Sequence, residues 1–415
     1  MVLFFTEMWE RFGFYTLMAI LVLYMDREFQ WDDSIKGNVY KYFLLSCYLF
    51  PIAGGWLGDR VLGPKKTVLI GASLMVAGYA ALTASSVERI PLFFIGIALV
   101  SVGTGLFKTN MSVAVGNLYS RTDSRKDAGY NIYYMAVNIG ATPAPLVATA
   151  IGIMFDNYNL SFAAAGIGMV LSLITFAAGK NGITEHAGVG AVGTPALAAA
   201  VPADAAENRQ RVVTLVTLFA IVIFFWLAFY QNGFALTLFA KRSTVSYDYL
   251  RPETYQFFNP FFILLLTPLL VSLFSRLRRS GKEPSSPVKI FWGMFISGFS
   301  MVVMVLASLA GGDLDQNLMS PSWLISAYLI LSVSEILVSP MGLSFVSKVA
   351  PRRIQGMMMG FWFVATSLGG YGAGQLGQFY STVSHNNYFF LLSALLFLSS
   401  FLVLAFRKRL NRFTT

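Results

Sequence analysis

The stretch FTEMWERFGFY at residues 5–15 places three charged residues, Glu7, Glu10 and Arg11, inside an otherwise apolar run. A charge at the centre of a membrane costs at least about 2.5 kcal/mol, so such residues usually face one another or a water-filled pathway. Glu7, Glu10 and Phe14 recur at helical spacing, which puts both carboxylates on one helix face. Arg11 follows Glu7 by four residues and can pair with it or with a neighbouring helix. The alternative is that the glutamates lie at headgroup depth, near a positive helix N-terminus.

The composition predicts a polytopic membrane protein. The 415 residues are 56% hydrophobic and only 12% charged, whereas soluble domains contain about 25% charged residues. Apolar stretches of about 17–25 residues are expected to cross a membrane as helices. The twelve expected helices are 2–25, 38–58, 67–86, 91–116, 129–154, 161–178, 211–240, 255–275, 288–310, 321–347, 354–381 and 388–406.

The helices divide into two sets of six. The expected domains are an N-terminal bundle at 1–178, a cytoplasmic linker at 179–210, a C-terminal bundle at 211–407 and a cytoplasmic tail at 408–415. The linker is rich in Ala and Gly and poor in large apolar groups, which is typical of a flexible connection.

Basic residues indicate the orientation. With both termini on one side, that side receives 21 of the 30 Lys and Arg residues and the other side receives 7. The positive-inside rule therefore places the termini in the cytoplasm, in the plasma membrane or bacterial inner membrane. Topology and lipid headgroups account for the net charge of +10, so no nucleic acid partner is expected. The single cysteine, Cys47, excludes an intrachain disulfide.

This sorting leaves five charged residues inside the expected helices: Glu7, Glu10, Arg11, Lys108 and Glu335. The stretch VSVGTGLFKTNM (100–111) also resembles LSVSEILVSPMG (331–342), as expected for halves repeated across the membrane. Lys108 and Glu335 fall one helical turn apart in these equivalent frames, so we expect them to face each other across a central cavity. A static ion pair that orients the bundles is the alternative.

The stretch GGWLGDRVLGPKK (54–66) resembles the loop motif of the major facilitator superfamily. Its glycines permit a tight turn and close helix packing, and Asp59 can bind a helix N-terminus or an arginine in one gating state. Asp59 and Arg60 are therefore candidate gating residues; the alternative is a plain cytoplasmic turn. The resemblance implies an all-α fold of twelve helices in two six-helix bundles.

Several motifs together resemble the proton-coupled oligopeptide transporter family. They are the Glu-x-x-Glu-Arg-Phe-x-x-Tyr pattern at 7–15, GTGLFKTN (103–110), YMAVNIGA (134–141), FFNPFFI (257–263), SEILVSPMGLSFVSKVAP (334–351) and MMGFWF (358–363). The resemblance implies proton-driven import of di- and tripeptides, with protons, a small peptide and the lipid bilayer as partners. It further implies proton coupling at Glu7, Glu10, Arg11, Lys108 and Glu335.

The resemblance also implies a peptide pocket. Besides Lys108 and Glu335, which would meet the carboxylate and amino ends of a peptide, the implied pocket residues are Tyr15, Tyr48, Asn138, Trp226, Asn259 and Trp362. Simple packing of the aromatic residues and interhelical hydrogen bonds of the two amides are the alternatives.

The chain departs from the family pattern at two charged positions. Where relatives carry an arginine that helps to bind the peptide carboxylate, this chain has Met18, and Tyr230 stands where they often carry a glutamate. Losing both partners of an ion pair together leaves no orphaned charge. These changes keep open a proton-coupled symporter for another small polar solute, such as an amino acid or nitrate. A peptide sensor without transport is a further alternative.

Other chemistries have little support. The two histidines, His186 and His385, fall in expected loops and lack metal-ligand spacing, and no phosphate-binding loop or nucleophile–base motif is present. We therefore expect no enzyme activity, no cofactor and no metal site.

Overall fold

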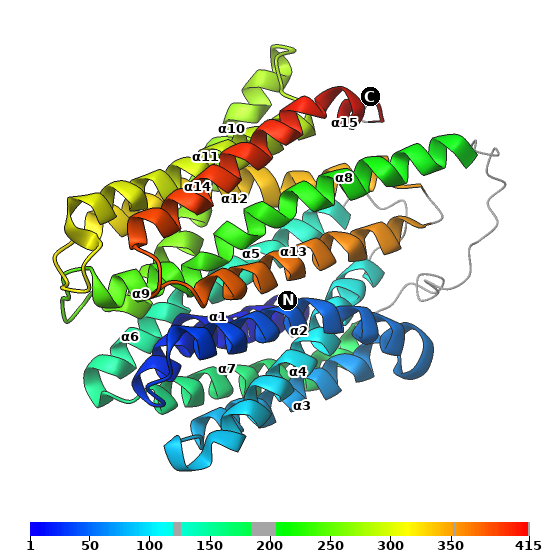
Figure 1. Cartoon of the computed structure of the whole chain (residues 1–415). Helices are drawn as coiled ribbons and strands as arrows, with labels where there is room; N and C mark the ends of the chain where they lie inside the picture. The colour runs from blue at the N-terminus through cyan, green and yellow to red at the C-terminus, as the bar shows by residue number, and fades with distance from the viewer. Residues whose placement is uncertain (119–125, 184–204, 352–353, 414–415) are drawn as a thin grey trace. The chain divides into compact units, whose positions relative to one another are not determined.

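The computed structural model describes residues 1–118, 126–183, 205–351 and 354–413, which are almost entirely helical (Figure 1). The long helices are α1 (Val2–Arg27), α2 (Asp33–Leu57), α3 (Pro64–Thr83), α4 (Ile90–Asn117), α5 (Lys126–Ala141), α6 (Pro143–Phe155), α7 (Tyr158–Gly179), α8 (Ala205–Phe229), α10 (Phe258–Arg279), α11 (Ser286–Ala307), α12 (Pro321–Val349), α13 (Gln355–Gly377) and α14 (His385–Ala405). The shorter elements are η1 (Gly58–Leu62), η2 (Val87–Arg89), η3 (Lys180–Gly182), η4 (Tyr230–Gly233), α9 (Ala235–Arg242), η5 (Pro252–Phe257), η6 (Ser308–Gly312) and α15 (Arg407–Asn411).

The helices are those of an integral membrane protein. Within the described residues, nine helical segments are long and apolar enough to cross a membrane. The helices α1, α2 and α13 are also long, at 26, 25 and 23 residues, but they contain more polar residues or glycine. The expected all-α class is confirmed, and the count of twelve crossings stays a prediction.

Helix α2 begins earlier than expected. The sequence predicts a helix at 38–58, whereas the structure starts it at Asp33. An acidic residue in the first turn is favourable beside the positive end of the helix dipole. Lys36, which was expected in a loop, therefore lies on this helix, and both Lys36 and Lys41 are buried.

Two other expected helices are interrupted. The helix predicted at 129–154 forms as α5 and α6, because Pro143 has no backbone N–H to continue the hydrogen-bond ladder. The helix predicted at 211–240 begins at Ala205 and changes to the turn η4 before α9. The Asn232–Gly233 pair has low helix propensity, which favours this interruption. The expected linker at 179–210 lies mostly outside the described residues.

The chain forms two compact units. Unit 1 contains Met1–Asp32, Tyr42–Ala196 and Tyr247–Phe257, and unit 2 contains Asp33–Lys41, Leu197–Ser246 and Phe258–Thr415. Two segments thus belong to a different unit from their neighbours in the chain: the first residues of α2, and the connection between α9 and α10. The domain boundaries expected from the sequence stay predictions.

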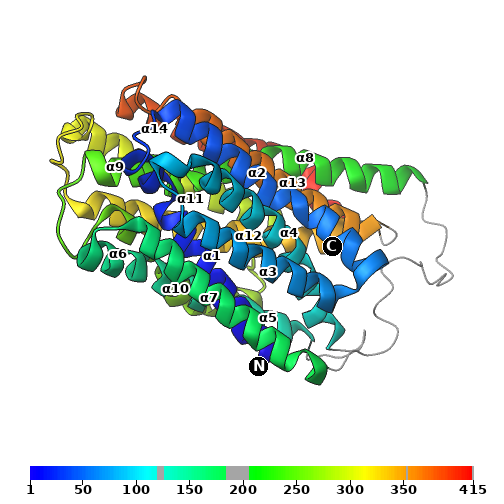
Figure 2. The same cartoon turned by 90° about the horizontal axis from the view of Figure 1, so that it is seen from below.

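In unit 1, α1 packs against α5 and α7, while α3 packs against α4 and α7 (Figures 1 and 2). Most of α1 is buried, including an unbroken run from Thr16 to Met25. A helix that is buried nearly all round needs small residues on its partners for close approach. Gly140 of α5 supplies one, because a Cβ at this position would lie 2.1 Å from the carbonyl oxygen of Met8.

In unit 2, α11 packs against α12 and α14, α8 against α13, and α10 against α12. Glycines again permit close contacts. A Cβ at Gly342 would lie 1.9 Å from the Trp362 ring, and one at Gly369 would lie 2.3 Å from the Cβ of Trp226. The indoles are therefore fixed where α12 meets α13 and where α8 meets α13.

The turn after α2 follows the physical expectation for its glycines. Gly63 has a φ of 78°, which is strained for other residues, and Pro64 then begins α3. A Cβ at Gly58 would lie 1.8 Å from Oδ1 of Asn110 on α4. Arg60 is exposed, and the side chain of Asp59 lies outside the described residues.

Two ion pairs of Glu283 hold the connection between α10 and α11. Oε2 of Glu283 accepts a hydrogen bond from Arg278 at 2.6 Å, and Oε1 accepts one from Lys289 at 2.6 Å. Arg278 first and Lys289 second lower the pKa of Glu283 to about 2. The contribution of these ion pairs to the stability of the fold is therefore present above the ordinary carboxyl pKa and is lost as the pH falls toward 2.

We predict that Gly140→Ala destabilises unit 1, because its Cβ would collide with the backbone of α1. Overpacking of this kind costs about 1–3 kcal/mol, and the loss is measured as a lower melting temperature in detergent. Gly360→Ala on α13 is the control, since nothing lies within 4 Å of its added Cβ. Equal melting temperatures for the two variants would contradict the close contact.

Candidate functional site

Arg11 joins the two buried glutamates of α1. Its Nη2 donates to Oε1 of Glu10 at 2.7 Å, a second and shorter contact joins Nε to the same carboxylate, and Nε lies 3.2 Å from Oε1 of Glu7. All three side chains are buried. The guanidinium also lies over the ring of Phe14, 5.1 Å from its centroid. Oε2 of Glu7 has no hydrogen-bond partner among the described residues, which leaves an acceptor available for a proton.

Lys108 of α4 belongs to the same electrostatic environment. It interacts with Arg11, Glu7 and Glu10, and its ammonium lies 4.7 Å from the ring centroid of Tyr48 on α2. Tyr15 is half-buried and interacts with Arg11. Unit 1 therefore brings together Glu7, Glu10, Arg11, Tyr15, Tyr48 and Lys108, all of which were predicted from the sequence. Two cations and two carboxylates in one buried region form an arrangement in which a proton change at one group affects the others.

Asn138 is also buried in unit 1, on α5, and its amide makes a contact within its own helix. Nδ2 donates to the carbonyl oxygen of Tyr134 at 3.1 Å. Neither the expected pocket role nor the interhelical alternative is tested by this contact. Its role in a pocket stays a prediction.

Glu335 of α12 accepts a hydrogen bond from a neutral donor in unit 2. Nδ2 of Asn259 on α10 donates to Oε2 of Glu335 at 3.0 Å and to Oγ of Ser332 at 3.1 Å. Ser332 Oγ is also within 3.2 Å of the Asn259 carbonyl oxygen. Asn259 precedes Pro260, which has no N–H to donate within the helix. The proximity of Asn259 to Glu335 was not predicted from their spacing.

Two predicted aromatic residues lie in unit 2. Trp226 stacks on Tyr230, with ring centroids 5.8 Å apart, and its Nε1 has no acceptor among the described residues. Trp362 makes an edge contact with Phe219 at 6.2 Å. Both indoles are buried. The Trp226 N–H is a donor that a bound polar ligand can use, whereas Trp362 is packed by carbon contacts.

Met18 and Tyr230, the two residues that depart from the family pattern, are both buried and uncharged. Met18 packs within α1, and its backbone carbonyl accepts a hydrogen bond from Gln256 at 3.3 Å. The Tyr230 ring stacks on Trp226, and its carbonyl accepts from the hydroxyl of Tyr40 at 2.9 Å. Each position is thus filled by a group that fits an apolar or aromatic neighbourhood. The expected contact between Lys108 and Glu335, which belong to different units, stays a prediction.

The sequence count of charges inside helices missed two buried lysines of α2. Lys36 is fully buried on α2, with Nζ 2.6 Å from Oδ1 of Asp33. Lys41 is also buried; its Nζ donates to Oε1 of Gln375 at 2.8 Å and lies 5.3 Å from the ring centroid of Tyr371 on α13. Both lysines were counted with the loop charges, Lys36 because the start of α2 was placed too late and Lys41 because it lies in the first turn of the helix expected at 38–58. An acidic helix start at Asp33 is the sequence signal that identifies their position.

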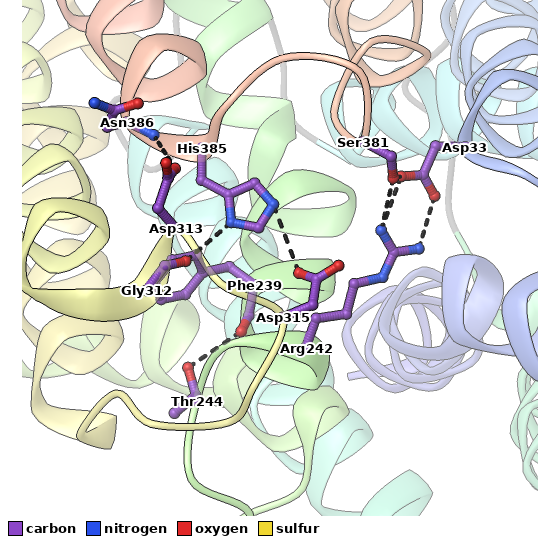
Figure 3. Close-up of polar contacts among 10 residues, drawn as sticks. All are labelled: Asp33, Phe239, Arg242, Thr244, Gly312, Asp313, Asp315, Ser381, His385 and Asn386. Carbon is purple, nitrogen blue, oxygen red and sulfur yellow. Dashed lines mark hydrogen bonds and ion pairs between the residues drawn. The ribbon is translucent and has the colours of Figure 1, made fainter.

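Figure 3 shows the polar groups around Asp33. Arg242, at the end of α9, donates from both terminal nitrogens to the carboxylate at 2.9 Å, and Ser381 makes a further short contact. A bidentate arginine–carboxylate pair is directional as well as strong. This cluster fixes the first turn of α2 within unit 2.

His385 is in a different setting from the one expected. It was predicted in a loop, but it begins α14 and is buried. Its Nδ1 lies 2.9 Å from the carbonyl oxygen of Gly312, its Nε2 lies 3.7 Å from Asp315, and its ring stacks on Tyr380 at 4.5 Å (Figure 3). The carbonyl can only accept, so Nδ1 is the donor. His186 lies outside the described residues.

Among the described residues, no group of three His, Cys, Asp or Glu side chains is arranged to hold a metal ion. The buried charges are instead paired with one another or with amide and hydroxyl groups. Such a site suits protons and a small charged or zwitterionic solute.

Comparison with known proteins identifies the family to which this chain is similar. The model of the POT family matches residues 65–201 and 194–391. The uncharacterized transporter YclF of Bacillus subtilis is 31% identical, covering 88% of this chain and 84% of the relative. Dipeptide and tripeptide permease A of Chromobacterium violaceum is 31% identical, covering 87% of this chain and 81% of the relative.

Solved structures agree with the sequence relatives. A peptide transporter POT in complex with sulfate has a TM-score of 0.88 and 30% identity, covering 99% of this chain and 94% of that chain. A mutant of a peptide transporter POT in complex with alafosfalin has a TM-score of 0.87 and 29% identity, with the same coverage. The fold of this chain is therefore that of the POT transporters.

We predict a measurable energetic coupling between Asn259 and Glu335. Losing a hydrogen bond to a charged group costs about 1.5–3 kcal/mol, so Asn259→Ala and Glu335→Ala should each lower stability in detergent. Because they remove the same contact, the double variant should lose less than the sum of the two singles. In the control cycle, Ser334→Ala takes the place of Asn259→Ala and is combined with Glu335→Ala. The Ser334 hydroxyl donates to a different group, the carbonyl oxygen of Gly293, at 2.7 Å. Strict additivity for Asn259 and Glu335 would show that the contact contributes nothing.

Proposed function

The chain belongs to the POT family, and on this premise we propose that it is a proton-driven symporter that imports di- and tripeptides by alternating access. The relatives support the substrate class, because one is named a dipeptide and tripeptide permease. The transporter structure with alafosfalin supports the same class. The membrane is the plasma membrane, or the bacterial inner membrane, with both termini in the cytoplasm, as the distribution of basic residues indicates.

The observation that carries the proton-coupling proposal is the Arg11 guanidinium bound by two buried carboxylates. An added proton on Glu7 or Glu10 weakens the attraction to Arg11 and removes the excess negative charge of these three groups, so that together with Lys108 they carry one net positive charge in a region of low dielectric. Lys108, in the same environment, then experiences a different field. Protonation of α1 is in this way linked to the group proposed to bind the substrate.

The substrate is proposed to be bound at its two charged ends. A peptide is a zwitterion, so the ammonium of Lys108 suits its carboxylate and the carboxylate of Glu335 suits its amino group. Asn259 orients Glu335 through its amide, and Trp226 offers an unpaired N–H among the described residues. Protonation of Glu335 would weaken its attraction to Lys108 and permit rearrangement. A membrane potential adds about 2.3 kcal/mol per charge per 100 mV to proton-driven uptake.

A second solute class is supported by one observation. Met18 and Tyr230 bring no charge to positions where the family resemblance implies an ion pair. A smaller polar solute, such as an amino acid or nitrate, needs fewer charged contacts than a peptide. A counterflow experiment distinguishes a peptide sensor from both kinds of symporter, because a sensor binds peptide without exchanging it across the membrane.

Uptake of labelled dipeptides into proteoliposomes tests the function. We expect accumulation only with an inward proton gradient, and we expect Glu10→Gln to abolish accumulation while peptide exchange remains measurable. Glu88→Gln, at an exposed carboxylate, is the matched control and should accumulate peptide at the wild-type rate. Gradient-driven accumulation at the wild-type rate by Glu10→Gln would exclude the proposed role of this carboxylate.

We predict that Lys108→Ala and Glu335→Ala each reduce driven uptake to background while the protein still folds. Removing one partner of a buried charge pair leaves the other uncompensated, at a cost of about 3–5 kcal/mol, and the protonation-dependent attraction is lost with it. Folding is checked by the melting temperature and elution profile in detergent.

The double variant should be no worse than either single variant, as expected for residues that act as a unit. Lys66→Ala, at an exposed lysine, is the control for loss of a positive charge. Near-normal driven uptake by either single variant, or clearly additive losses in the double, would show that the two residues are not a switched pair.

A further inference from the structure

The connection between α9 and α10 forms a strap on unit 1. Its residues Tyr247–Phe257 are grouped with unit 1, although both flanking helices belong to unit 2. The turn η5 within the strap packs against α6 and α1. The strap is therefore a segment of the second half of the chain that is attached to the first.

Glu253 is the buried acid of this strap. It is 0% exposed, and Oε2 is 3.3 Å from the hydroxyl of Tyr158 on α7, a long hydrogen bond. Oε1 has no hydrogen-bond partner among the described residues. An ionised carboxylate in such a position loses its hydration and gains little in exchange.

The nearby positive charges are bound to another acid. Arg27 at the end of α1 donates to both oxygens of the Asp156 side chain at 2.7 and 2.8 Å, and to its backbone carbonyl at 2.9 Å. Arg251 of the strap lies 3.9 Å from the same carboxylate. Arg27 holds the pKa of Asp156 below its ordinary value. Asp156 is therefore the ionised acid of the region, and it takes the closest contacts of both arginines.

Two further contacts of the strap are uncharged. Thr254 and Thr149 share a hydrogen bond at 2.7 Å between their hydroxyls, and Gln256 donates to the Met18 carbonyl at 3.3 Å. Gly152 leaves room for the acid, because a Cβ there would lie 3.2 Å from both Glu253 Oε1 and Arg251 Nη1. A neutral strap thus fits the surface of α6 and α1 well.

We propose that Glu253 is a proton-binding site that fastens the strap to unit 1 when protonated and releases it when ionised. The step is the binding of one proton from water to the Glu253 carboxylate, which gives a neutral acid. The groups that face Glu253 are Tyr158 of α7, Arg27 of α1 and Arg251 of the strap itself. A neutral carboxyl can donate to the Tyr158 hydroxyl, whereas the ionised form gains by moving into water.

This site is separate from the cluster on α1. Arg27, beside Glu253, follows Glu7 by twenty residues, which is about 30 Å along a helix. With the termini in the cytoplasm, an orientation that rests on the proposed function, Glu253 responds to the pH outside the cell. The fastening itself does not depend on that orientation or on transport.

Infrared spectroscopy of the full-length protein in lipid tests proton binding. We expect the carbonyl stretch of a protonated carboxylic acid at neutral pH, and its partial loss in Glu253→Gln but not in Glu88→Gln. An acid band of the same intensity in wild type and Glu253→Gln would overturn the proposal, whatever the transport activity of either protein.

Hydrogen exchange of the amides of residues 247–257 tests the release. The exchange rates are first corrected for intrinsic exchange. The opening constant of the strap should then rise about tenfold per pH unit above the midpoint of strap release, as expected for the loss of one proton from Glu253. Glu253→Gln should keep the strap protected at all pH values. A strap whose protection is independent of pH in the wild type, or equally dependent on pH in Glu253→Gln, contradicts the proposal.

Tyr158→Phe provides a second variant that keeps the acid. This substitution removes the hydrogen bond that holds the acid in the attached strap, so the midpoint of strap release should move to lower pH. An unchanged midpoint would overturn the role of Glu253, because Tyr158 is the residue that binds its carboxylate.

Discussion

The rest of unit 1 depends on the double contact of Arg11 with Glu7 and Glu10. One guanidinium between two carboxylates leaves one negative charge in excess in a buried region, and a single charge at membrane depth is costly. Lys108 supplies a further positive charge within the same electrostatic environment. The four groups therefore form a set in which no member can change its charge without affecting the energy of the others. This mutual dependence is what proton coupling requires.

The helix packing of unit 1 keeps the α1 charges of this set buried and Lys108 half-buried. Helix α1 is covered by α5 and α7, and Gly140 lets α5 approach the backbone of α1 one turn before Arg11. On the other side of the cluster, glycines let α2 and α4 come together, which places Tyr48 beside Lys108. Small residues at helix contacts are the usual way in which membrane helices pack closely. The motifs that carry the charges are thus accompanied by the glycines that position them.

The sequence predicted the features that depend on residue type and local spacing. The buried charges of α1, Lys108 and Glu335 were found because charges are rare in apolar helices. Features that depend on where a helix begins were missed: a start at Asp33, rather than 38, brings Lys36 onto the helix and places Lys41 beyond its first turn, and both are buried. Contacts between distant segments were missed as well. Nothing in the local pattern around Glu253 indicates that its segment packs against unit 1, or that Asn259 donates to Glu335.

Glu10 and Glu335 differ in what holds them, and this difference bears on their roles. Glu10 is bound by a guanidinium, so a proton on it removes a charge–charge attraction inside unit 1. Glu335 is held by the amide of Asn259, so its protonation weakens a hydrogen bond but breaks no ion pair with the residues shown to contact it. The roles that we propose for the two carboxylates follow this difference: Glu335, held by a neutral amide, is proposed to bind the substrate, and Glu10, bound by a guanidinium, is proposed to couple protons to transport.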